Sequence, residues 1–155
     1  TCALPISIGL EFCCENEVCV QSIIMIEPIV IGSKYIKELF RKQKLKDIMT
    51  GNQSKPLNEE AFCNLEGYKT SKKFIEQMKN LSLIKKAERI KAVNVFIIQI
   101  TNSLKIQNEY LLLGEHLKSN GVNVEIRIFN LPAFWERVAD GDYSEIGQTI
   151  LRWSR

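Results

Sequence analysis

A strand–helix–strand pattern in residues 93–129 is the feature that most constrains the fold of this chain of 155 residues. Val93–Ile100 is apolar on both faces, which is typical of a strand in the middle of a parallel sheet. An amphipathic helix follows, and Ser119-Asn120-Gly121 supplies a left-handed helix stop. Val122–Phe129 then alternates apolar and polar residues, as a strand with one solvated face does. Parallel strands joined by one helix form a right-handed crossover in nearly all known proteins.

A third strand is expected near the N-terminus. Residues 18–31, VCVQSIIMIEPIVI, are rich in β-branched side chains, and Pro28 ends or splits the strand because it cannot donate to a ladder. The predicted fold class is therefore α/β: a small three-layer-like domain whose short, mainly parallel sheet has strands near 18–31, 93–100 and 122–129 and is covered by helices.

The domain organisation follows from composition. The chain is 45% hydrophobic and 25% charged, which is ordinary for one folded domain and excludes collagen-like and wholly disordered proteins. We expect one domain over 8–155, with a loop at 52–67 because Asn, Gln, Ser, Pro and Gly gather there. Thr1–Ser7 resembles translated read-through of a sequencing adapter, in which case the natural chain begins near Ile8; the alternative is a frayed N-terminus of the protein itself. The sequence is compatible both with a whole domain and with a fragment of one.

Charge is concentrated in the middle of the chain. Residues 34–91 contain 15 basic and 7 acidic side chains, whereas residues 1–33 contain four acidic side chains and no basic one. A basic segment attracts polyanions, although lysines on exposed helix faces also serve solubility alone. In the helix expected after Ser33, the apolar stripe loses its phase at Leu45, so we expect this helix to bend or end before Gly51. The candidate nucleic-acid-binding residues are Lys72, Lys73, Lys79, Lys85, Lys86 and Arg89.

Cysteine and histidine spacing predicts no metal site. Cys13, Cys14, Cys19 and Cys63 lack the paired Cys-x2-Cys knuckles of a zinc site, and His116 is the only histidine. Reduced thiols fit a cytoplasmic protein. No cofactor is predicted either, because the turn after Ile100 has no glycine-rich phosphate cradle.

Polar residues follow the predicted strands where ligands bind in open parallel sheets. They serve either as ligand contacts or as ordinary loop caps. Glu27 is either a buried carboxylate with a shifted pKa or a solvent-facing strand end. Glu125-Ile126-Arg127 loosely resembles the acidic-x-Lys signature of restriction-type nucleases, with arginine in place of lysine. The ligand-loop candidates are Thr101, Asn102, Ser103 and Asn130.

The stretch VNVFIIQITNSLKIQNEYLLLGEHLKSNGVNVEIRIF resembles the opening strand–helix–strand of the anticodon-binding domain of class II aminoacyl-tRNA synthetases. It is also similar to the first units of Toll/interleukin-receptor domains. Either resemblance implies an α/β fold with a parallel sheet. No functional residue of this chain is assigned from either family, because no third strand or catalytic glutamate can be matched.

Three functions remain open from the sequence. The first is a non-catalytic intracellular module whose basic helices contact nucleic acid. The second is a nuclease or nucleotide-processing enzyme, or a fragment of one, with its site at the ends of the strands at 93–100 and 122–129. The third is a protein-interaction fragment. No membrane partner is expected, because no apolar run approaches the roughly 20 residues of a spanning helix.

Overall fold

The computed structural model describes residues 19–51, 62–65, 68–132 and 142–154. The chain folds into two compact units. We call the one made of residues up to Val30 and from Leu83 onward the sheet unit, and the one from Ile31 to Ser82 the helical unit. The single domain over 8–155 stays a prediction. Thr1–Ser7 and most of the predicted loop at 52–67 lie outside the described residues.

The sheet unit contains the predicted parallel sheet. Its strands are β1 (Val20–Ile26), β4 (Ala92–Ile100) and β5 (Asn123–Phe129), in the order β1-β4-β5 with both pairings parallel. Each predicted strand is present, so the α/β fold class is confirmed. β1 and β5 flank β4, and six consecutive residues of β4, from Val95 to Ile100, are buried.

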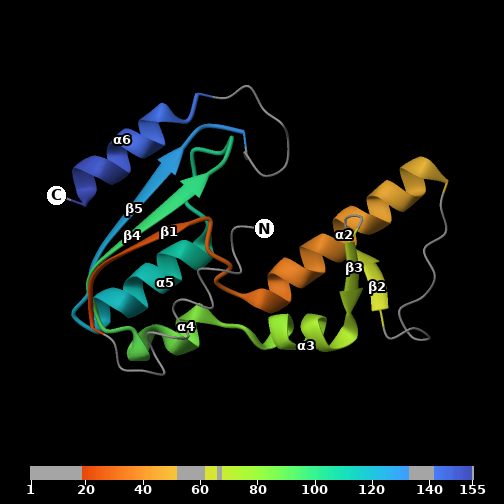
Figure 1. Cartoon of the computed structure of the whole chain (residues 1–155), viewed down its shortest axis with the longest axis horizontal. Coiled ribbons are helices and arrows are strands. Elements are labelled where there is room, and N and C mark those ends of the chain that lie inside the picture. The colour runs from red at the N-terminus through yellow and green to blue at the C-terminus, as the bar shows by residue number, and fades with distance from the viewer. Residues whose placement is uncertain (1–18, 52–61, 66–67, 133–141, 155) are drawn as a thin grey trace. The chain divides into compact units, whose positions relative to one another are not determined.

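Helices cover both faces of this sheet, as Figure 1 shows for α5 (Asn108–Ser119) and α6 (Ser144–Trp153). On the α5 side, a Cβ added to Gly114 would lie 3.1 Å from the Ile126 side chain, so α5 approaches the sheet closely at this glycine. On the other face, the Trp153 ring stacks on Phe96 with centroids 5.2 Å apart. Two short helices, α4 (Leu83–Lys86) and η1 (Ala87–Arg89), precede β4.

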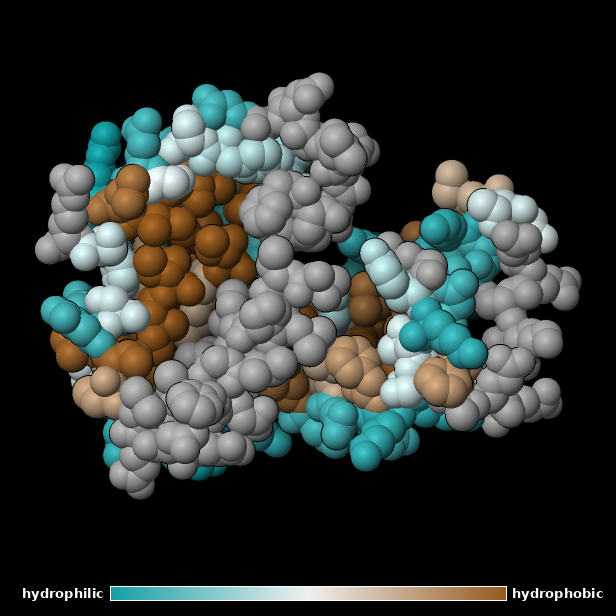
Figure 2. Space-filling view, viewed as in Figure 1, coloured by the Kyte–Doolittle hydropathy of each residue, from teal (hydrophilic) through white to brown (hydrophobic). Residues whose placement is uncertain are grey.

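The β1 side of the sheet is less fully covered. Ile24 and Ile26 pack against the core but are only partly buried. Figure 2 shows an apolar surface over the sheet.

The helical unit combines α2 (Gly32–Thr50), α3 (Lys72–Asn80) and an antiparallel hairpin of β2 (Phe62–Leu65) and β3 (Tyr68–Ser71). α2 ends before Gly51, as predicted, and Gly51 adopts the left-handed conformation. The Ser71 hydroxyl oxygen accepts a hydrogen bond from the Phe74 N–H at 3.2 Å and so caps the N-terminus of α3. Residues 62–65, expected in a loop, form β2 instead. Their composition does not indicate a strand, but pairing with β3 provides hydrogen bonds for their backbone.

Gly32 allows α2 and α3 to pack closely. A Cβ at this position would lie 1.7 Å from the backbone oxygen of Met78 in α3. The Gly32 N–H donates to the Leu81 carbonyl at 2.9 Å. Among the described residues of the unit, the buried apolar side chains are Ile36 on α2, Leu65 on β2, and Ile75 and Met78 on α3. The face of α2 that carries Lys37, Arg41 and Lys44 is exposed.

Candidate functional site

Glu27 joins two strands and a helix at the carboxyl edge of the sheet. One carboxylate oxygen accepts a hydrogen bond from the Ile100 N–H at the end of β4. The other accepts from the Tyr110 hydroxyl of α5 at 3.2 Å. Glu27 itself is half-buried and has a φ of 48°, an uncommon conformation for a residue with a side chain. The structure thus combines the two alternatives from the sequence: Glu27 ends the strand, but its carboxylate is bonded inside the unit.

The surroundings of Tyr110 keep its hydroxyl protonated. Tyr110 is 4% exposed, and burial is the largest cause that raises its pKa well above the ordinary value. The negative charge of Glu27 acts in the same direction, as does their hydrogen bond. Glu27 and Tyr110 therefore pair as a carboxylate acceptor and a neutral phenol donor.

The loop after β4 is held by polar side chains of the same edge. Gln99 is 1% exposed, donates from its amide nitrogen to the Lys105 carbonyl at 3.1 Å and accepts from the Gln107 N–H at 2.9 Å. The Thr101 hydroxyl accepts from the Ser103 N–H at 3.2 Å, and the Ser103 hydroxyl accepts from the Lys105 N–H at 3.2 Å. These bonds favour the interpretation of Thr101 and Ser103 as loop caps.

Two predicted ligand-loop residues remain open to solvent. Asn102 and Asn130 are both exposed. The Thr101 N–H donates to the Phe129 carbonyl at 3.0 Å, so the ends of β4 and β5 lie together and carry Thr101 and Asn130 at one edge. Sequence reasoning missed Gln99 and Tyr110. A polar residue in an otherwise buried apolar strand was the signal that could have found Gln99.

The structure shows no cluster of metal ligands in the described residues. Among them, no group of three or more His, Cys, Asp or Glu side chains could hold an ion. His116 is exposed on α5, with its Nδ1 2.8 Å from the Leu112 carbonyl oxygen. Cys19 is exposed and Cys63 half-buried, and burial raises the pKa of the Cys63 thiol.

The six basic candidates are divided between the two units. Lys72, Lys73 and Lys79 belong to α3 in the helical unit, whereas Lys85, Lys86 and Arg89 lie on α4 and η1 in the sheet unit. On α3, helical spacing puts Lys72 and Lys79 on one side, while Lys73 is turned about 100° away from Lys72. The three lysines of α3 thus form no single stripe.

α2 carries a more regular cationic surface, which we call the α2 stripe. It consists of Lys34, Lys37, Arg41 and Lys44, all exposed and spaced by three, four and three residues. This spacing places them on one face of the helix along roughly 15 Å. Glu38 holds the Arg41 guanidinium through two hydrogen bonds of 2.8 and 2.6 Å, and this pairing lowers the pKa of Glu38.

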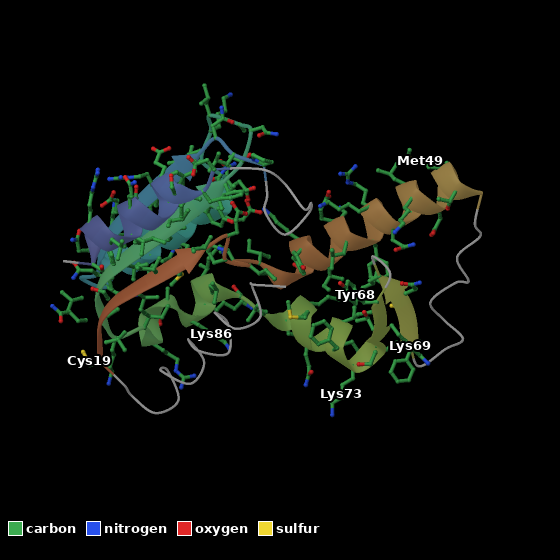
Figure 3. All side chains as sticks on the ribbon, turned by 45° about the horizontal axis from the view of Figure 1, so that its top comes forward. Cys19, Met49, Tyr68, Lys69, Lys73 and Lys86 are labelled. Atoms are coloured by element: carbon green, nitrogen blue, oxygen red, sulfur yellow. The ribbon has the colours of Figure 1, made fainter. Side chains whose placement is uncertain are left out.

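Apolar side chains occupy the C-terminal end of the same face. Leu45, Ile48 and Met49 are 47%, 68% and 86% exposed, and we call them the apolar tip. Met49 and Lys73 project from opposite sides of the helical unit in Figure 3, so the α2 face and the outer face of α3 are separate surfaces.

Comparison with known proteins gives no relative: no protein-family model, curated protein or solved structure matches this chain. In the described residues, the structure contains no helix that is both long and apolar enough to cross a membrane.

Proposed function

We propose that this protein is a non-catalytic nucleic-acid-binding module and that the α2 stripe supplies its phosphate contacts. The observation that carries the proposal is the alignment of Lys34, Lys37, Arg41 and Lys44 on one exposed helix face. Lysines that serve solubility alone need no alignment. A row of cations along roughly 15 Å matches the repeating charge of a phosphate backbone, and binding gains free energy by releasing its counterions.

The stripe is unfavourable for the helix on its own. Like charges three and four residues apart destabilise a helix by about 0.2–0.5 kcal/mol per pair. The first turn of α2 contains no acidic residue, and Lys34 is placed near the positive end of the helix dipole. A bound polyanion would relieve both effects. Arg41 already donates to Glu38 from Nε and one terminal nitrogen, so a phosphate would meet only its remaining N–H groups.

The carboxyl edge of the sheet gives less support to the enzymatic alternative. The polar atoms of Glu27, Thr101 and Ser103 are engaged in hydrogen bonds within the sheet unit. Glu125, the acidic member of the nuclease-like triplet, forms an ion pair with Arg127 at 2.7 Å. Metal-assisted hydrolysis needs carboxylates that converge on an ion, and these two acids are occupied elsewhere.

The proposal is tested by fluorescence anisotropy of a labelled oligonucleotide titrated with the full chain at several salt concentrations. We expect the logarithm of the binding constant to fall linearly with the logarithm of salt, with a slope of about −2 to −3 for three or four phosphate contacts. The variant Lys37→Glu/Lys44→Glu should bind at least tenfold more weakly and with a shallower slope.

The matched control is Lys105→Glu/Lys118→Glu, which reverses two exposed charges of the sheet unit. It should lose much less affinity than the α2 variant. A second pair, Lys72→Glu/Lys79→Glu, tests the α3 surface that the sequence favoured. No binding at about 50 mM salt, or equal losses in the α2 variant and the control, would refute a nucleic-acid function for the stripe.

A further inference from the structure

The outer edge of β5 is a surface of the sheet unit that phosphate binding by α2 does not use. β5 is the last strand in the order β1-β4-β5, and it pairs with β4 along one edge. The Thr101 N–H donates to the Phe129 carbonyl at 3.0 Å, so the backbone groups of Phe129 point toward β4. Backbone groups alternate along a strand, and those of Val124, Ile126 and Ile128 therefore point outward. Within the part of the chain that the structure describes, these three residues form no backbone hydrogen bond at that edge.

The side chains of β5 divide into an apolar row and a charged pair. Val124 and Ile126 lie under α5, since a Cβ added to Gly114 would be 3.7 and 3.1 Å from them. Glu125 and Arg127 alternate with these residues and so lie on the opposite face of the sheet. Their side chains are 40% and 52% exposed and form an ion pair along the strand. The edge of β5 thus has apolar side chains on one face and two opposite charges on the other.

We propose that two copies of this chain pair through β5, antiparallel and centred on Ile126, so that their sheets join into one continuous sheet. Glu125 then lies directly opposite Arg127 of the second copy, and Val124 lies opposite Ile128. Cross-strand pairs of opposite charge and of apolar side chains both stabilise an antiparallel pair of strands. The twofold axis repeats each contact, so the strand is complementary to itself.

Charge selects this register over its neighbours. A shift by one residue would put the charged side chains of one copy on the apolar face of the other. A shift by two would put Glu125 opposite Glu125 of the second copy, or Arg127 opposite Arg127, and like charges directly opposite are destabilising. The backbone fits as well: Ile126 lies on the axis with its N–H and C=O outward, so the two copies can exchange both hydrogen bonds there.

The sequence of β5 does not protect this edge against pairing. Proteins that keep an edge strand single use lysines, prolines, bulges or very short strands. β5 has seven residues and contains neither lysine nor proline. Its two charges are paired with each other, with the Arg127 Nε donating to Glu125 at 3.0 Å, so the strand presents no net charge that would repel a second copy.

The experiment is sedimentation equilibrium of the full chain over a range of concentrations. We expect the wild type to approach twice the mass of one chain as the concentration rises to about 100 µM. Glu125→Arg leaves two arginines on each β5, facing two arginines of the second copy, and should weaken dimerisation about tenfold or more. Arg127→Glu should do the same, because two glutamates then face two glutamates.

Charge exchange supplies the matched controls. Glu125→Arg/Arg127→Glu keeps an ion pair along the strand and restores opposite charges across the axis, so this variant should dimerise as the wild type does. An equimolar mixture of the Glu125→Arg chain and the Arg127→Glu chain should form a heterodimer, because each glutamate again meets an arginine. Mixing would not rescue two chains that had simply failed to fold.

A backbone variant tests the pairing without changing any charge. Ile126→Pro removes the N–H that points outward at the axis, and an edge strand tolerates proline where its nitrogen faces away from the sheet. Circular dichroism should show a folded chain, and sedimentation should show a monomer. The variant Lys37→Glu/Lys44→Glu should still dimerise, so the failure of nucleic-acid binding and the failure of dimerisation are separate results.

Several results would overturn this inference. They are a wild type that stays monomeric at about 100 µM, a mixture of the two charge variants that stays monomeric, and a folded Ile126→Pro chain that dimerises as the wild type does. The inference also fails if Ile48→Ala/Met49→Ala abolishes the dimer while Glu125→Arg retains it, because the apolar tip of α2 would then be the interface.

Discussion

The bond between Tyr110 and Glu27 offers a sharp test of how the carboxyl edge of the sheet is held. Tyr110→Phe removes only the hydroxyl, so the packing of a ring that is 4% exposed is kept. A hydrogen bond to a charged group contributes about 1.5–3 kcal/mol. The 3.2 Å separation is longer than the usual 2.5–2.7 Å for a hydroxyl on a carboxylate, and water reaches the half-buried Glu27. We therefore expect a loss of about 1–1.5 kcal/mol.

Glu27→Ala should cost more. It leaves both the Ile100 N–H and the Tyr110 hydroxyl without their carboxylate, in residues that are 5% and 4% exposed. Each unpaired buried donor costs about 1–3 kcal/mol, so the expected total for the two donors is about 2–6 kcal/mol. Glu27→Gln keeps an acceptor oxygen and should lie between the wild type and Glu27→Ala.

The assay is urea unfolding followed by tryptophan fluorescence, since Trp153 stacks on Phe96 in the sheet unit. In the Glu27→Ala background, Tyr110→Phe should be neutral or slightly stabilising, because the hydroxyl no longer has its acceptor. The coupling free energy of the double-mutant cycle should then be about 1 kcal/mol or more. If Tyr110→Phe costs the same in both backgrounds, the hydroxyl and the carboxylate do not act as a pair.

Three further predictions follow from single side chains. Gly32→Ala should destabilise the helical unit by about 2 kcal/mol or more, since the new Cβ would lie 1.7 Å from a backbone oxygen of α3. Urea unfolding followed by circular dichroism measures this loss. Gly147→Ala is the control, because a Cβ there meets open space and should cost nothing. The pKa of Tyr110 is raised in the folded state, so its contribution to stability is full below the unfolded pKa of about 10 and is lost as pH rises toward the folded pKa. Between pH 9 and 11.5, the free energy of unfolding should therefore fall more steeply for the wild type than for Tyr110→Phe. Equal declines in the two proteins would contradict the raised pKa. Iodoacetamide at pH 8 should modify exposed Cys19 faster than Cys63, whose thiol pKa is raised by burial. Peptide mass spectrometry measures the two rates, and faster modification of Cys63 would contradict the burial of its thiol.

The sheet could be predicted because its signals are local. Val95–Ile100 is apolar at every position except Gln99, and β5 alternates, so hydrophobic pattern and crossover handedness together specify two parallel strands. The hairpin gave no such signal, because its strands of four residues lie in or beside polar sequence and each depends on the other for its hydrogen bonds. Strands that short carry too few side chains for a period to be recognised.

The polar site at the sheet edge depends on contacts that are distant in sequence. Glu27 and Tyr110 are 83 residues apart, and nothing in the neighbourhood of either residue indicates the other. The basic candidates show a related limit: a count of charges over residues 34–91 does not reveal that the chain passes from one compact unit to the other between Ser82 and Leu83. Charge density along the chain is therefore a weak guide to charge density on a surface.

The apolar stripe of α2 goes out of phase at Leu45, and this indicates where the packed surface under the helix ends rather than where the helix itself ends. An apolar stripe goes out of phase either where the helix stops or where the partner surface under it stops. α2 continues to Thr50, so the second cause applies: Gly32 and Ile36 are its buried residues, and the apolar residues of its last two turns have moved to the exposed face. The described core does not require apolar side chains there, and Leu45, Ile48 and Met49 are 47%, 68% and 86% exposed, so the end of α2 presents an apolar surface that packing within the unit does not explain.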